Sequence, residues 1–470
     1  MKFYRMGYLM SREFDSIIIG AGQAGPPLAA RLTQAGQRVA LLERKLFGGT
    51  CVNTGCIPTK TMIASAQAAR VVRRAADFGV RVGSTITVDM PAVMARKNLI
   101  SGKSRSSVEA NLRGMERCTV FHEQARFLSA REVQAGSETL TAERIFINVG
   151  GRARIPSMPG MEHVSCLTNS SLLELETLPR HLVVVGGSYI GLEFAQMYRR
   201  FGSEVTVIEK GARLVAHEDE DVSDAIKGVL EAEGIDFRLD AECIAFRRSG
   251  EDIAVHVNCE SGEPEIIGTH VLLAVGREPN TDDLGLEQAG VLLDRNGYIV
   301  VDDQLRTNVQ GIYALGDCNG RGAFTHTSYN DFEIVAANLL DGASRRVTDR
   351  IQAHALYIDP PLGQIGMTER EVRQSGRPAL MGTRPMTQVG RAIEKGETFG
   401  FMKILVDAES KKIVGASILG TGGDEAIHCI LDTMYANQDY TTLQHAMHIH
   451  PTVSELIPTV LGNLKPLANS

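Results

Sequence analysis

Two cysteines, Cys51 and Cys56, are the residues of this sequence whose type and spacing most clearly indicate chemistry. They lie in the run Gly48-Gly49-Thr50-Cys51-Val52-Asn53-Thr54-Gly55-Cys56-Ile57-Pro58-Thr59-Lys60. A regular α-helix would place their side chains about 140° apart around its axis, whereas a disulfide needs Cα atoms within about 7 Å of each other. The segment between them must therefore be irregular, which Gly55 permits, and Pro58 suits the first turn of a helix. The run is predicted to form a small disulfide at a helix start; two unrelated core cysteines are the alternative.

The composition narrows the class of protein that positions these thiols. A chain of 470 residues is expected to hold about three domains. Its net charge of −7 argues against a nucleic-acid or anionic-membrane surface, and we find no run of apolar residues long enough for a membrane span. Eight cysteines over this length are too sparse for a disulfide scaffold. Because no second close cysteine pair accompanies the first, a four-cysteine zinc site is disfavoured, and no metal site is predicted.

The N-terminal segment predicts no secretory signal. Met1 to Glu13 contains Lys2, Arg5 and Arg12 but no apolar core of a signal peptide. We expect an extension ahead of the first strand, with Met6 or Met10 as alternative start sites, and a cytoplasmic protein.

A dinucleotide-binding pattern begins near residue 16. Its parts are a buried strand, a glycine turn, a helix and a second strand: Ser16–Ile19, Gly20-Ala21-Gly22-Gln23-Ala24-Gly25, Pro26–Ala35 and Arg38–Leu42. Gly20 makes the turn, Gly22 lets the backbone approach a pyrophosphate, and Gly25 allows close packing of the helix. The phosphates would lie at the positive end of that helix. Glu43, 18 residues after Gly25, could accept hydrogen bonds from both ribose hydroxyls.

The same pattern recurs in the middle of the chain. Its parts are Leu182–Val185, Gly186-Gly187-Ser188-Tyr189-Ile190-Gly191, Leu192–Phe201 and Glu204–Ile208, and it ends in Glu209. Ser188 replaces the second glycine, and its Cβ would crowd a pyrophosphate slightly. Glu209 would bind a free 2′-hydroxyl and repel a 2′-phosphate, which favours NADH over NADPH. Lys210 and Arg213 lie close by and could soften that preference.

Further glycine segments mark where the chain crosses between domains. Ile145–Gly151 is predicted to end the first domain, and Leu273–Arg277 the second. Thr307–Asp317 is predicted to be a strand that returns to the first domain. It would place Asp317 where a buried carboxylate could hold a polyol chain; a cap on the next helix is the alternative.

Together these residues resemble the FAD-dependent pyridine nucleotide–disulfide oxidoreductases, the family of lipoamide dehydrogenase, glutathione reductase and mercuric reductase. The resemblance runs from Phe14 to about Leu464. It rests on GGTCVNTGCIPTK, both glycine turns, TNVQGIYALGD and His450-Pro451-Thr452-Val453-Ser454-Glu455. It implies an α/β fold with two Rossmann-like domains and an α+β C-terminal dimerisation domain. The expected divisions are FAD binding (14–150), NAD(P) binding (151–275), a return to the FAD or central domain (276–345) and dimerisation (346–470).

The resemblance also implies a role for each matching residue. Cys51 would be the interchange thiol that meets the substrate, and Cys56 the charge-transfer thiol against the flavin. Lys60 and Glu193 would form an ion pair near flavin N5, and Tyr189 would be the gate over the nicotinamide pocket. Asp317 would hold the FAD ribitol, and His450 would act from the other subunit as acid and base, oriented by Glu455. The FAD positions would be Gly20, Gly22, Gly25, Glu43, Thr50, Lys60, Gly316 and Asp317, and the NAD(P) positions Gly186, Gly187, Tyr189, Gly191, Glu209 and Gly276.

The thiol chemistry is consistent with these roles. Thiol exchange needs a thiolate, and a neighbouring imidazole can take and return the proton. The spacing of His450 and Glu455 lets the carboxylate fix the imidazole tautomer. His445 and His448 are interpreted as structural or solvent-facing. A cluster of Met447, His448 and His450 that binds a soft metal is the alternative.

Departures from the family pattern indicate the branch. The sequence ends without the vicinal cysteine pair of mercuric reductases, has His450 where they carry a tyrosine, and shows no N-terminal CxxC module. Glu209 stands where glutathione reductases begin their phosphate-binding arginines. The segments 324–331 and 359–369, and Asn148-Val149-Gly150, are similar to the mercuric-reductase-like, reactive-chlorine-resistance branch, whose members reduce Cu(II) or hypothiocyanous acid.

The predicted function is therefore that of a homodimeric, FAD-dependent NAD(P)H oxidoreductase. Its Cys51–Cys56 pair would pass electrons to a small oxidant, a disulfide, Cu(II), Hg(II) or hypothiocyanous acid. An NAD-linked dihydrolipoamide dehydrogenase is the alternative, and a non-catalytic nucleotide-sensing flavoprotein is a more remote one.

Overall fold

The structure is a computed structural model that describes residues 11–83, 86–242, 244–258 and 264–467. Met6 and Met10, the alternative start sites, lie outside these ranges, as do Cys243 and Cys259. The chain divides into two compact units. The first holds the residues up to Met62, Pro91–Arg154 and Gly276–Arg350, and the second holds Ile63–Met90, Ile155–Val275 and the residues from Ile351 onward. No helix in the described ranges is long and apolar enough to cross a membrane.

The first unit is built on a largely parallel sheet. The strand order is β3 (Cys118–Phe121), β2 (Val39–Leu42), β1 (Ser11–Ile19), β6 (Glu138–Ile147), β5 (Glu132–Ala135) and β4 (Ala125–Phe127), and β16 (Ile312–Ala314) also pairs with β6. Strands β3, β2, β1, β6 and β16 are parallel, whereas β5 and β4 form an antiparallel extension. Ile17, Ile18 and all of β2 are buried, as expected for parallel strands covered on both faces.

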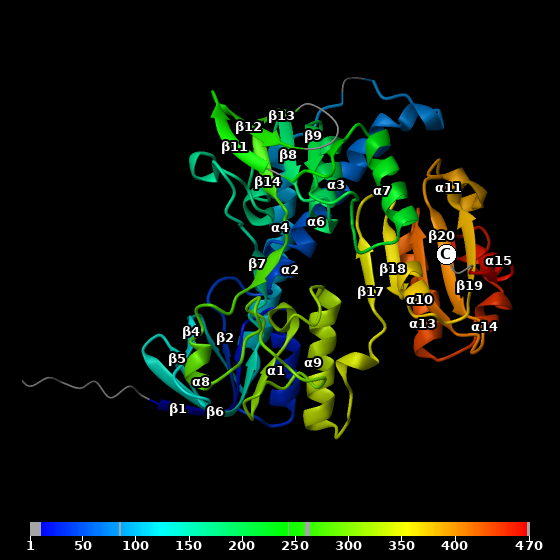
Figure 1. The fold of residues 1–470 in the computed structure, drawn as a ribbon. Helices are drawn as coiled ribbons and strands as arrows, with labels where there is room; N and C mark the ends of the chain where they lie inside the picture. Colours follow the sequence, from blue (N-terminus) through cyan, green and yellow to red (C-terminus); the bar gives the residue numbers. More distant parts are fainter. Residues whose placement is uncertain (1–10, 84–85, 243, 259–263, 468–470) are drawn as a thin grey trace, which may run out of the picture. The chain divides into compact units, whose positions relative to one another are not determined.

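Helices cover this sheet. Its helical segments are α1 (Gly25–Gln34), α2 (Gly49–Asn53), α4 (Met90–Arg113), α8 (Leu286–Ala289) and α9 (Thr325–Leu340), while α3 (Cys56–Arg73) begins in this unit. Helix α1 packs on β1 and β2, and α9 lies beside α1 (Figure 1). Helix α1 buries Leu28, Ala29 and Leu32 toward the sheet. The carboxyl ends of β1 and β2 therefore open onto the start of α1, where such folds bind nucleotides.

The second unit holds a smaller parallel sheet of the same kind. Its order is β10 (Asp236–Arg238), β9 (Glu204–Ile208), β8 (His181–Val185) and β14 (His270–Leu273). The helices of this part are α5 (Asn169–Leu172), α6 (Tyr189–Phe201) and α7 (Glu220–Ala232), and α6 packs on β8 and β9. An antiparallel sheet is formed by β11 (Ile244–Ser249), β12 (Asp252–Val257) and β13 (Glu265–Gly268). The β8–α6–β9 unit repeats the β1–α1–β2 unit.

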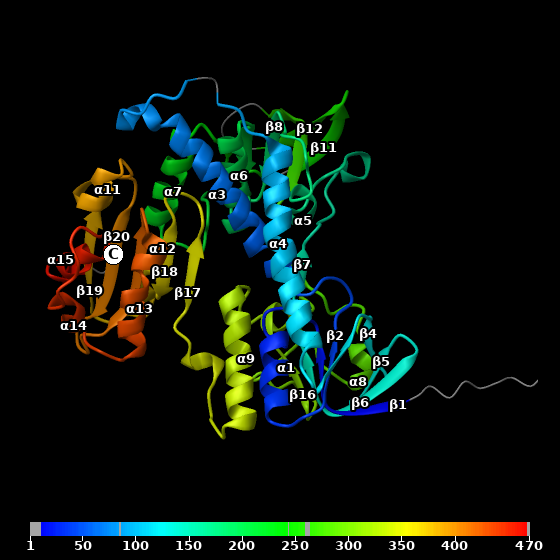
Figure 2. The ribbon, with the colours of Figure 1, turned by 180° about the vertical axis from the view of Figure 1, so that it is seen from behind.

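The C-terminal part of the second unit is an antiparallel sheet with helices. Its order is β17 (Ala353–Leu356), β18 (Leu362–Gly366), β21 (Ile413–Leu419), β20 (Phe401–Asp407), β19 (Ala379–Pro385) and β22 (Lys465–Pro466). The helices are α10 (Glu369–Gln374), α11 (Gly390–Glu394), α12 (Gly423–Ala426), α13 (His428–Tyr435), α14 (Thr441–Gln444) and α15 (Ile457–Leu461). Helices α12 and α13 pack near β21, and α15 packs on β19 and β20 (Figure 2). The predicted α/β class with two Rossmann-like domains and an α+β C-terminal domain is confirmed.

The two predicted crossing segments form one ribbon. Strand β7 (Gly151–Ala153) pairs antiparallel with β15 (Arg277–Pro279), and Gly151 faces Pro279. The chain therefore leaves the first unit and returns to it at adjacent strands.

One predicted strand was too long. Thr307–Asp317 was expected to be a strand, but only Ile312–Ala314 is extended and paired with β6. The Thr307 hydroxyl accepts the N–H of Val309, and the N–H of Ile312 donates to the Val309 carbonyl. The first half of the predicted strand is therefore a turn. Gly316 then begins a short 3₁₀ helix, Gly316–Asn319. The helices also begin earlier than expected: α1 starts at Gly25 instead of Pro26, and α6 at Tyr189 instead of Leu192.

Candidate active site and nucleotide-binding sites

The two cysteines lie on successive helices with a short break between them. Helix α2 carries Cys51, and α3 begins at Cys56. At Gly55 a Cβ atom would lie 2.9 Å from the carbonyl oxygen of Thr50, so a side chain there would collide with the backbone of α2. Both cysteines are half-buried and present as thiols. The break changes the direction of the chain and brings Cys51 within interaction range of Cys56.

The polar surroundings of the thiols come from within the first unit. The hydrogen bond with Cys56 and burial together raise the pKa of the Cys51 thiol well above its usual range, while Thr325 and the positive charge of Lys60 act in the opposite direction. The Cys56 sulfur lies 3.2 Å from the Thr325 hydroxyl. The position of Cys56 at the first turn of α3 also favours a thiolate there, because a helix N-terminus is positive. Burial and Cys56 thus disfavour the thiolate of Cys51, so its thiol chemistry would call for a base.

The first glycine turn has no room for larger residues. Gly20 has φ +105°, and a Cβ there would lie 2.3 Å from the carbonyl oxygen of Asn148; a Cβ at Gly25 would lie 2.3 Å from that of Gly20. Asn148 also supplies a buried side-chain N–H₂ group that has no hydrogen-bond partner in the described part of the chain. This donor would lie 3.3 Å from a Cβ at Gly22. An unpaired buried donor beside a helix N-terminus fits a bound pyrophosphate.

The two acids that end the second strands have the same hydrogen bonds. Glu43 accepts the N–H of Ala21 at 2.9 Å and that of Lys45 at 2.8 Å. Glu209 accepts the N–H of Gly187 at 2.6 Å and that of Gly211 at 2.8 Å. Each carboxylate is therefore held against its glycine turn, and each turn fits a dinucleotide in the same way.

The second glycine turn repeats the tight contacts of the first. Gly186 has φ +113°, and a Cβ at Gly191 would lie 2.0 Å from the Gly186 carbonyl oxygen. Ser188, which replaces the second glycine of the motif, immediately precedes α6 with an extended backbone. Gly276 has φ +111° and open space where a Cβ would be; it follows β14 on the way back to the first unit.

Asp317 lies in the 3₁₀ helix that follows β16. Burial raises its pKa, and the charge of Arg277 acts against that rise; the Arg277 Nε lies 3.7 Å from the carboxylate. The N–H of Gly316 donates to Asp331 at 2.7 Å. Asp331, which the sequence analysis did not single out, thus fixes the turn that presents Asp317.

Glu193 and Tyr189 lie one turn apart on α6. Glu193 is buried and accepts the N–H of Tyr357 at 3.1 Å. Lys60 belongs to the first unit and Glu193 to the second, and their ion pair stays a prediction. The Tyr189 hydroxyl donates to Glu218, which also contacts His354. Neither Glu218 nor His354 was predicted from the sequence. The acidic run 218–221 resembles an ordinary helix N-terminus, and nothing in the local sequence distinguishes His354.

The C-terminal histidine is exposed and paired. His450 Nδ1 lies 2.8 Å from Glu455; the imidazole is 82% exposed and the carboxylate 17%. The His450–Pro451 peptide bond is cis. The exposed imidazole is oriented by a largely covered acid, as an acid–base group requires.

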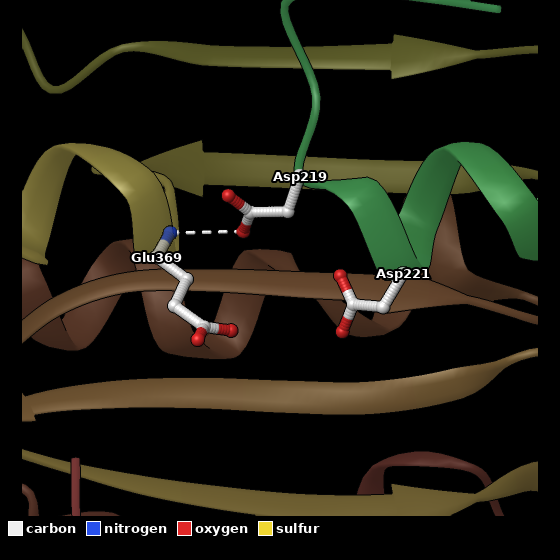
Figure 3. Close-up of side chains that lie close together, drawn as sticks. All are labelled: Asp219, Asp221 and Glu369. Atoms are coloured by element: carbon white, nitrogen blue, oxygen red, sulfur yellow. Dashed lines mark hydrogen bonds between the residues drawn. The ribbon is translucent and has the colours of Figure 1, made fainter. Parts of the chain in front are cut away.

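Three carboxylates elsewhere in the second unit are close enough together to bind a metal ion. The oxygens of Asp219, Asp221 and Glu369 lie within 4.8 Å of one another, and Asp219 accepts the N–H of Glu369 (Figure 3). The buried ammonium of Lys403 lies 2.9, 2.8 and 3.2 Å from these three acids. Lys403 already supplies the positive charge, so the group is an ion-pair network.

The two glycine turns, the dithiol and the C-terminal sheet define a flavoprotein oxidoreductase. Residues 14–331 match the family model of pyridine nucleotide-disulphide oxidoreductases, and residues 352–461 match the dimerisation domain of the same family. The chain belongs to the pyridine nucleotide-disulphide oxidoreductases. Members of this family depend on FAD and use NAD(P)H, and the recognised resemblance is confirmed.

Several known proteins are similar to the whole chain. RclA of Escherichia coli (strain K12), a probable pyridine nucleotide-disulfide oxidoreductase, is 34% identical over 461 residues, which are 96% of this chain and 100% of RclA. A dihydrolipoyl dehydrogenase of Chlamydia muridarum is 30% identical and covers 95% of this chain and 96% of its own. A mercuric reductase of Streptomyces lividans is 30% identical and covers 94% of both. The solved Cu(II) complex of the HOCl-induced flavoprotein disulfide reductase RclA from E. coli has a TM-score of 0.87 at 33% identity and covers 96% of this chain and 99% of that chain. The chain is thus a flavoprotein disulfide reductase of the RclA and mercuric reductase type.

Proposed function

We propose that this protein uses NAD(P)H to reduce a small oxidant, a disulfide or a metal ion through Cys51 and Cys56. The acceptor would be of the Cu(II), Hg(II) or hypothiocyanous acid type. The observation that carries the proposal is the thiol site itself: Cys51 and Cys56 interact across the α2–α3 break, beside Lys60 and Thr325. Disulfide exchange needs such a pair of close thiols with a stabilised thiolate.

The residues divide the work in the proposed reaction. The proposed FAD positions would hold the flavin, whose chemistry would be to take up a hydride from NAD(P)H and to pass two electrons to the Cys51–Cys56 disulfide. Cys56, at the positive start of α3, would carry the thiolate, and Lys60 with Glu193 would provide an ion pair at the flavin site. Cys51 would attack or bind the acceptor. His450 of the partner subunit would take the proton of Cys51, since burial and Cys56 keep that thiol protonated.

We propose the FAD positions Gly20, Gly22, Gly25, Glu43, Thr50, Lys60, Gly316 and Asp317, and the NAD(P) positions Gly186, Gly187, Tyr189, Gly191, Glu209 and Gly276. The domain divisions 14–150, 151–275, 276–345 and 346–470 are proposed with them. The dimerisation-domain match supports a homodimer.

NADH is the proposed electron donor. Glu209 has the same backbone hydrogen bonds as Glu43, and a carboxylate in that position suits a ribose with a free 2′-hydroxyl. A 2′-phosphate would meet its negative charge. Arg213 lies 3.1 Å from Glu220, and this ion pair diverts it from a phosphate.

An NAD-linked dihydrolipoamide dehydrogenase is the second candidate. The His450–Glu455 hydrogen bond and the Chlamydia relative favour it. The similarity to RclA, which has been solved as a Cu(II) complex, favours the small-oxidant and metal-ion acceptors.

An acceptor screen tests the proposal. Oxidation of NADH and NADPH by the purified holoenzyme is followed with Cu(II), Hg(II), hypothiocyanous acid, glutathione disulfide and lipoamide. We expect efficient turnover with at least one of the first three and a lower KM for NADH than for NADPH. Turnover confined to lipoamide would establish the second candidate instead.

Variants separate the thiol route from other reductions. Cys51→Ser should retain FAD and abolish acceptor turnover, while Cys118→Ser, a half-buried cysteine of the same unit, should behave as the native protein. Anaerobic NADH should produce a long-wavelength thiolate–flavin absorption in the native protein. If that absorption is absent and no acceptor is reduced, the result would favour the nucleotide-sensing alternative.

A further inference from the structure

A largely buried group of three polar side chains lies at the entrance of the second glycine turn. Tyr189 is the first residue of α6 and follows that turn directly. Its hydroxyl donates a hydrogen bond to Glu218 Oε1. His354 Nε2 lies 2.7 Å from the same oxygen and 3.2 Å from the tyrosine hydroxyl. The rings of Tyr189 and His354 also make an edge contact, with centroids 5.5 Å apart. Three polar atoms therefore converge on one another.

The group draws on three separate segments of the second unit. Tyr189 belongs to the nucleotide unit, Glu218 precedes α7, and His354 is on β17 of the dimerisation domain. Glu218 is fixed by its own backbone, whose N–H donates to Val215 at 2.8 Å. Its neighbour Asp219 accepts two backbone N–H groups at the start of α10. The backbone position of Glu218 is therefore set independently of Tyr189.

Burial of the Glu218 carboxylate destabilises the folded protein. Its side chain is 1% exposed, and its second oxygen has no hydrogen-bond partner in the described ranges. A desolvated carboxylate that leaves half of its acceptors unused destabilises a protein. A residue serving stability alone would have both oxygens satisfied, as Glu233 has with Arg200. The hydrogen bond to Tyr189 connects Glu218 to the nucleotide site.

We propose that Glu218 and His354 are positioning residues that hold the Tyr189 ring over the nicotinamide entrance until NAD(P)H displaces it. The inference rests on the proposed function, in which Tyr189 is the gate. Opening the gate breaks the hydrogen bond between the tyrosine hydroxyl and a buried charged acceptor. Because the gate is open in only a small fraction of the molecules, the apparent affinity for the nucleotide is lower than the affinity of the open form.

Removing the hydrogen bond should therefore tighten nucleotide binding. Tyr189→Phe keeps the ring and deletes the hydroxyl, and Glu218→Gln keeps the shape and deletes the charge. Because hydrogen bonds to charged groups are the strong ones, each variant should lower the Kd of NADH by about tenfold. His354→Gln should act in the same direction with a smaller effect, since it leaves the Tyr189–Glu218 bond in place.

A double-mutant cycle tests the proposal. Flavin reduction by NADH is followed anaerobically by stopped flow in the holoenzyme, and Kd is taken from the saturation of the rate. If the residues act through Tyr189, Glu218→Gln changes nothing further in the Tyr189→Phe background. Equal effects of Glu218→Gln in both backgrounds, or weaker nucleotide binding in Tyr189→Phe, would overturn the proposal. Glu231→Gln, at an exposed position of α7, is the matched control and should leave Kd unchanged.

The same measurement separates this inference from the proposed function. If NADH and NADPH fail to reduce the flavin of the native protein, the proposed function is wrong. If they do reduce it and the cycle is additive, the proposed function stands and the positioning role is wrong. Tyr189→Phe deletes a single oxygen and should fold. Its effect on Kd therefore still tests the proposal if Glu218→Gln does not fold.

Discussion

At the scale of single residues, the reactivity of Cys51 depends on a hydroxyl that comes from far along the chain. Cys56 and burial raise the pKa of Cys51, whereas Thr325 and Lys60 lower it. Thr325 stands at the start of α9, 269 positions from Cys56, whose sulfur it contacts. A hydroxyl in this position can donate to either sulfur as negative charge develops on it.

Replacing Thr325 by valine should therefore make Cys51 less reactive. The Thr325→Val change removes an interaction that lowers the pKa of Cys51, so the pKa rises further and less thiolate is present at neutral pH. Alkylation of Cys51 by iodoacetamide in the dithiol-reduced protein should slow by about threefold to tenfold. Its dependence on pH should move to higher pH.

Thr327→Val provides the control for that change. The Thr327 hydroxyl donates to the Phe324 carbonyl at 2.7 Å and lies on the same turn of α9. Equal slowing of alkylation in both variants would mean that the start of α9, and not the Thr325 hydroxyl, is responsible.

The residues that the sequence could not predict are those joined by long-range contacts. Cys51, Cys56 and both glycine turns were predicted because each pattern is complete within a short stretch of chain. Thr325, Glu218 and His354 each contact a predicted residue more than twenty positions away. Nothing in the local sequence distinguishes Thr325 from the adjacent hydroxyl residues of THTS.

At the scale of elements, each glycine turn fixes the distance between a strand and the helix that follows it. A Cβ at Gly191 would lie 2.0 Å from the backbone oxygen of Gly186. Contacts of this kind are set by backbone atoms, which cannot rotate away as a side chain can. A helix was correctly predicted after this turn, but its start was placed at Leu192 instead of Tyr189. The helix begins earlier because it starts as soon as the turn closes.

Gly191→Ala should damage the NAD(P)H site and spare the FAD site. The added methyl group displaces α6 from β8, at a cost of about 1–3 kcal/mol. Reduction of the flavin by NADH should slow strongly, while dithionite still reduces it and FAD remains bound.

Gly228→Ala is the corresponding control. Gly228 lies in α7, and a Cβ there would have no atom of another described segment within 4 Å, so alanine should stabilise the helix by about 0.5–1 kcal/mol and leave flavin reduction unchanged. Loss of FAD from Gly191→Ala would contradict the assignment of this turn to NAD(P)H.

The Lys403 network connects α7, α10 and β20 through charge. Burial alone would lower the pKa of Lys403, but its hydrogen bonds to Asp221 and Asp219 raise it. Lys403→Met should leave three acids close together without a cation, and we expect a loss of about 3–5 kcal/mol in the free energy of unfolding of this unit. Thermal unfolding followed by circular dichroism measures the effect. Lys412→Met, on a partly exposed lysine, should change it little; equal losses would refute the role of burial.

The same network predicts sensitivity to acid. Burial would raise the pKa of Asp219, but the backbone N–H of Arg370 and the Lys403 ammonium lower it below its usual value of 3.8. A carboxylate with a depressed pKa contributes stability that is present above that value and is lost as the pH falls below it. In Lys403→Met this acid-dependent loss should be smaller.

At the scale of the whole molecule, the proposed active site needs two chains, because His450 is expected to serve the thiols of its partner. Each homodimer would then have two sites, and each site would combine residues of both subunits. His450 is exposed in the single chain, as a residue that works in a partner's site should be.

Subunit mixing tests this arrangement. Cys51→Ser and His450→Gln homodimers should each be nearly inactive with the acceptor. After they are refolded together, half of the dimers are mixed, and each mixed dimer has one site with native Cys51 and His450. Turnover should return to about a quarter of the native value. No recovery, with mixed dimers verified by differential tags, would place His450 in the site of its own chain.

The β7–β15 ribbon has a consequence for the construction of the molecule. Gly151 pairs with Pro279, and Ala153 pairs with Arg277, so the chain departs toward residues 155–275 and comes back at points about 5 Å apart. A segment with adjoining ends can be exchanged for another without stretching its host. We therefore expect the proposed donor specificity to be exchangeable: residues 155–275 of an NADPH-using relative could be joined to the two strands without moving Cys51 or Cys56, provided that the contacts of Arg200 with Gln67 and Asp359 are kept.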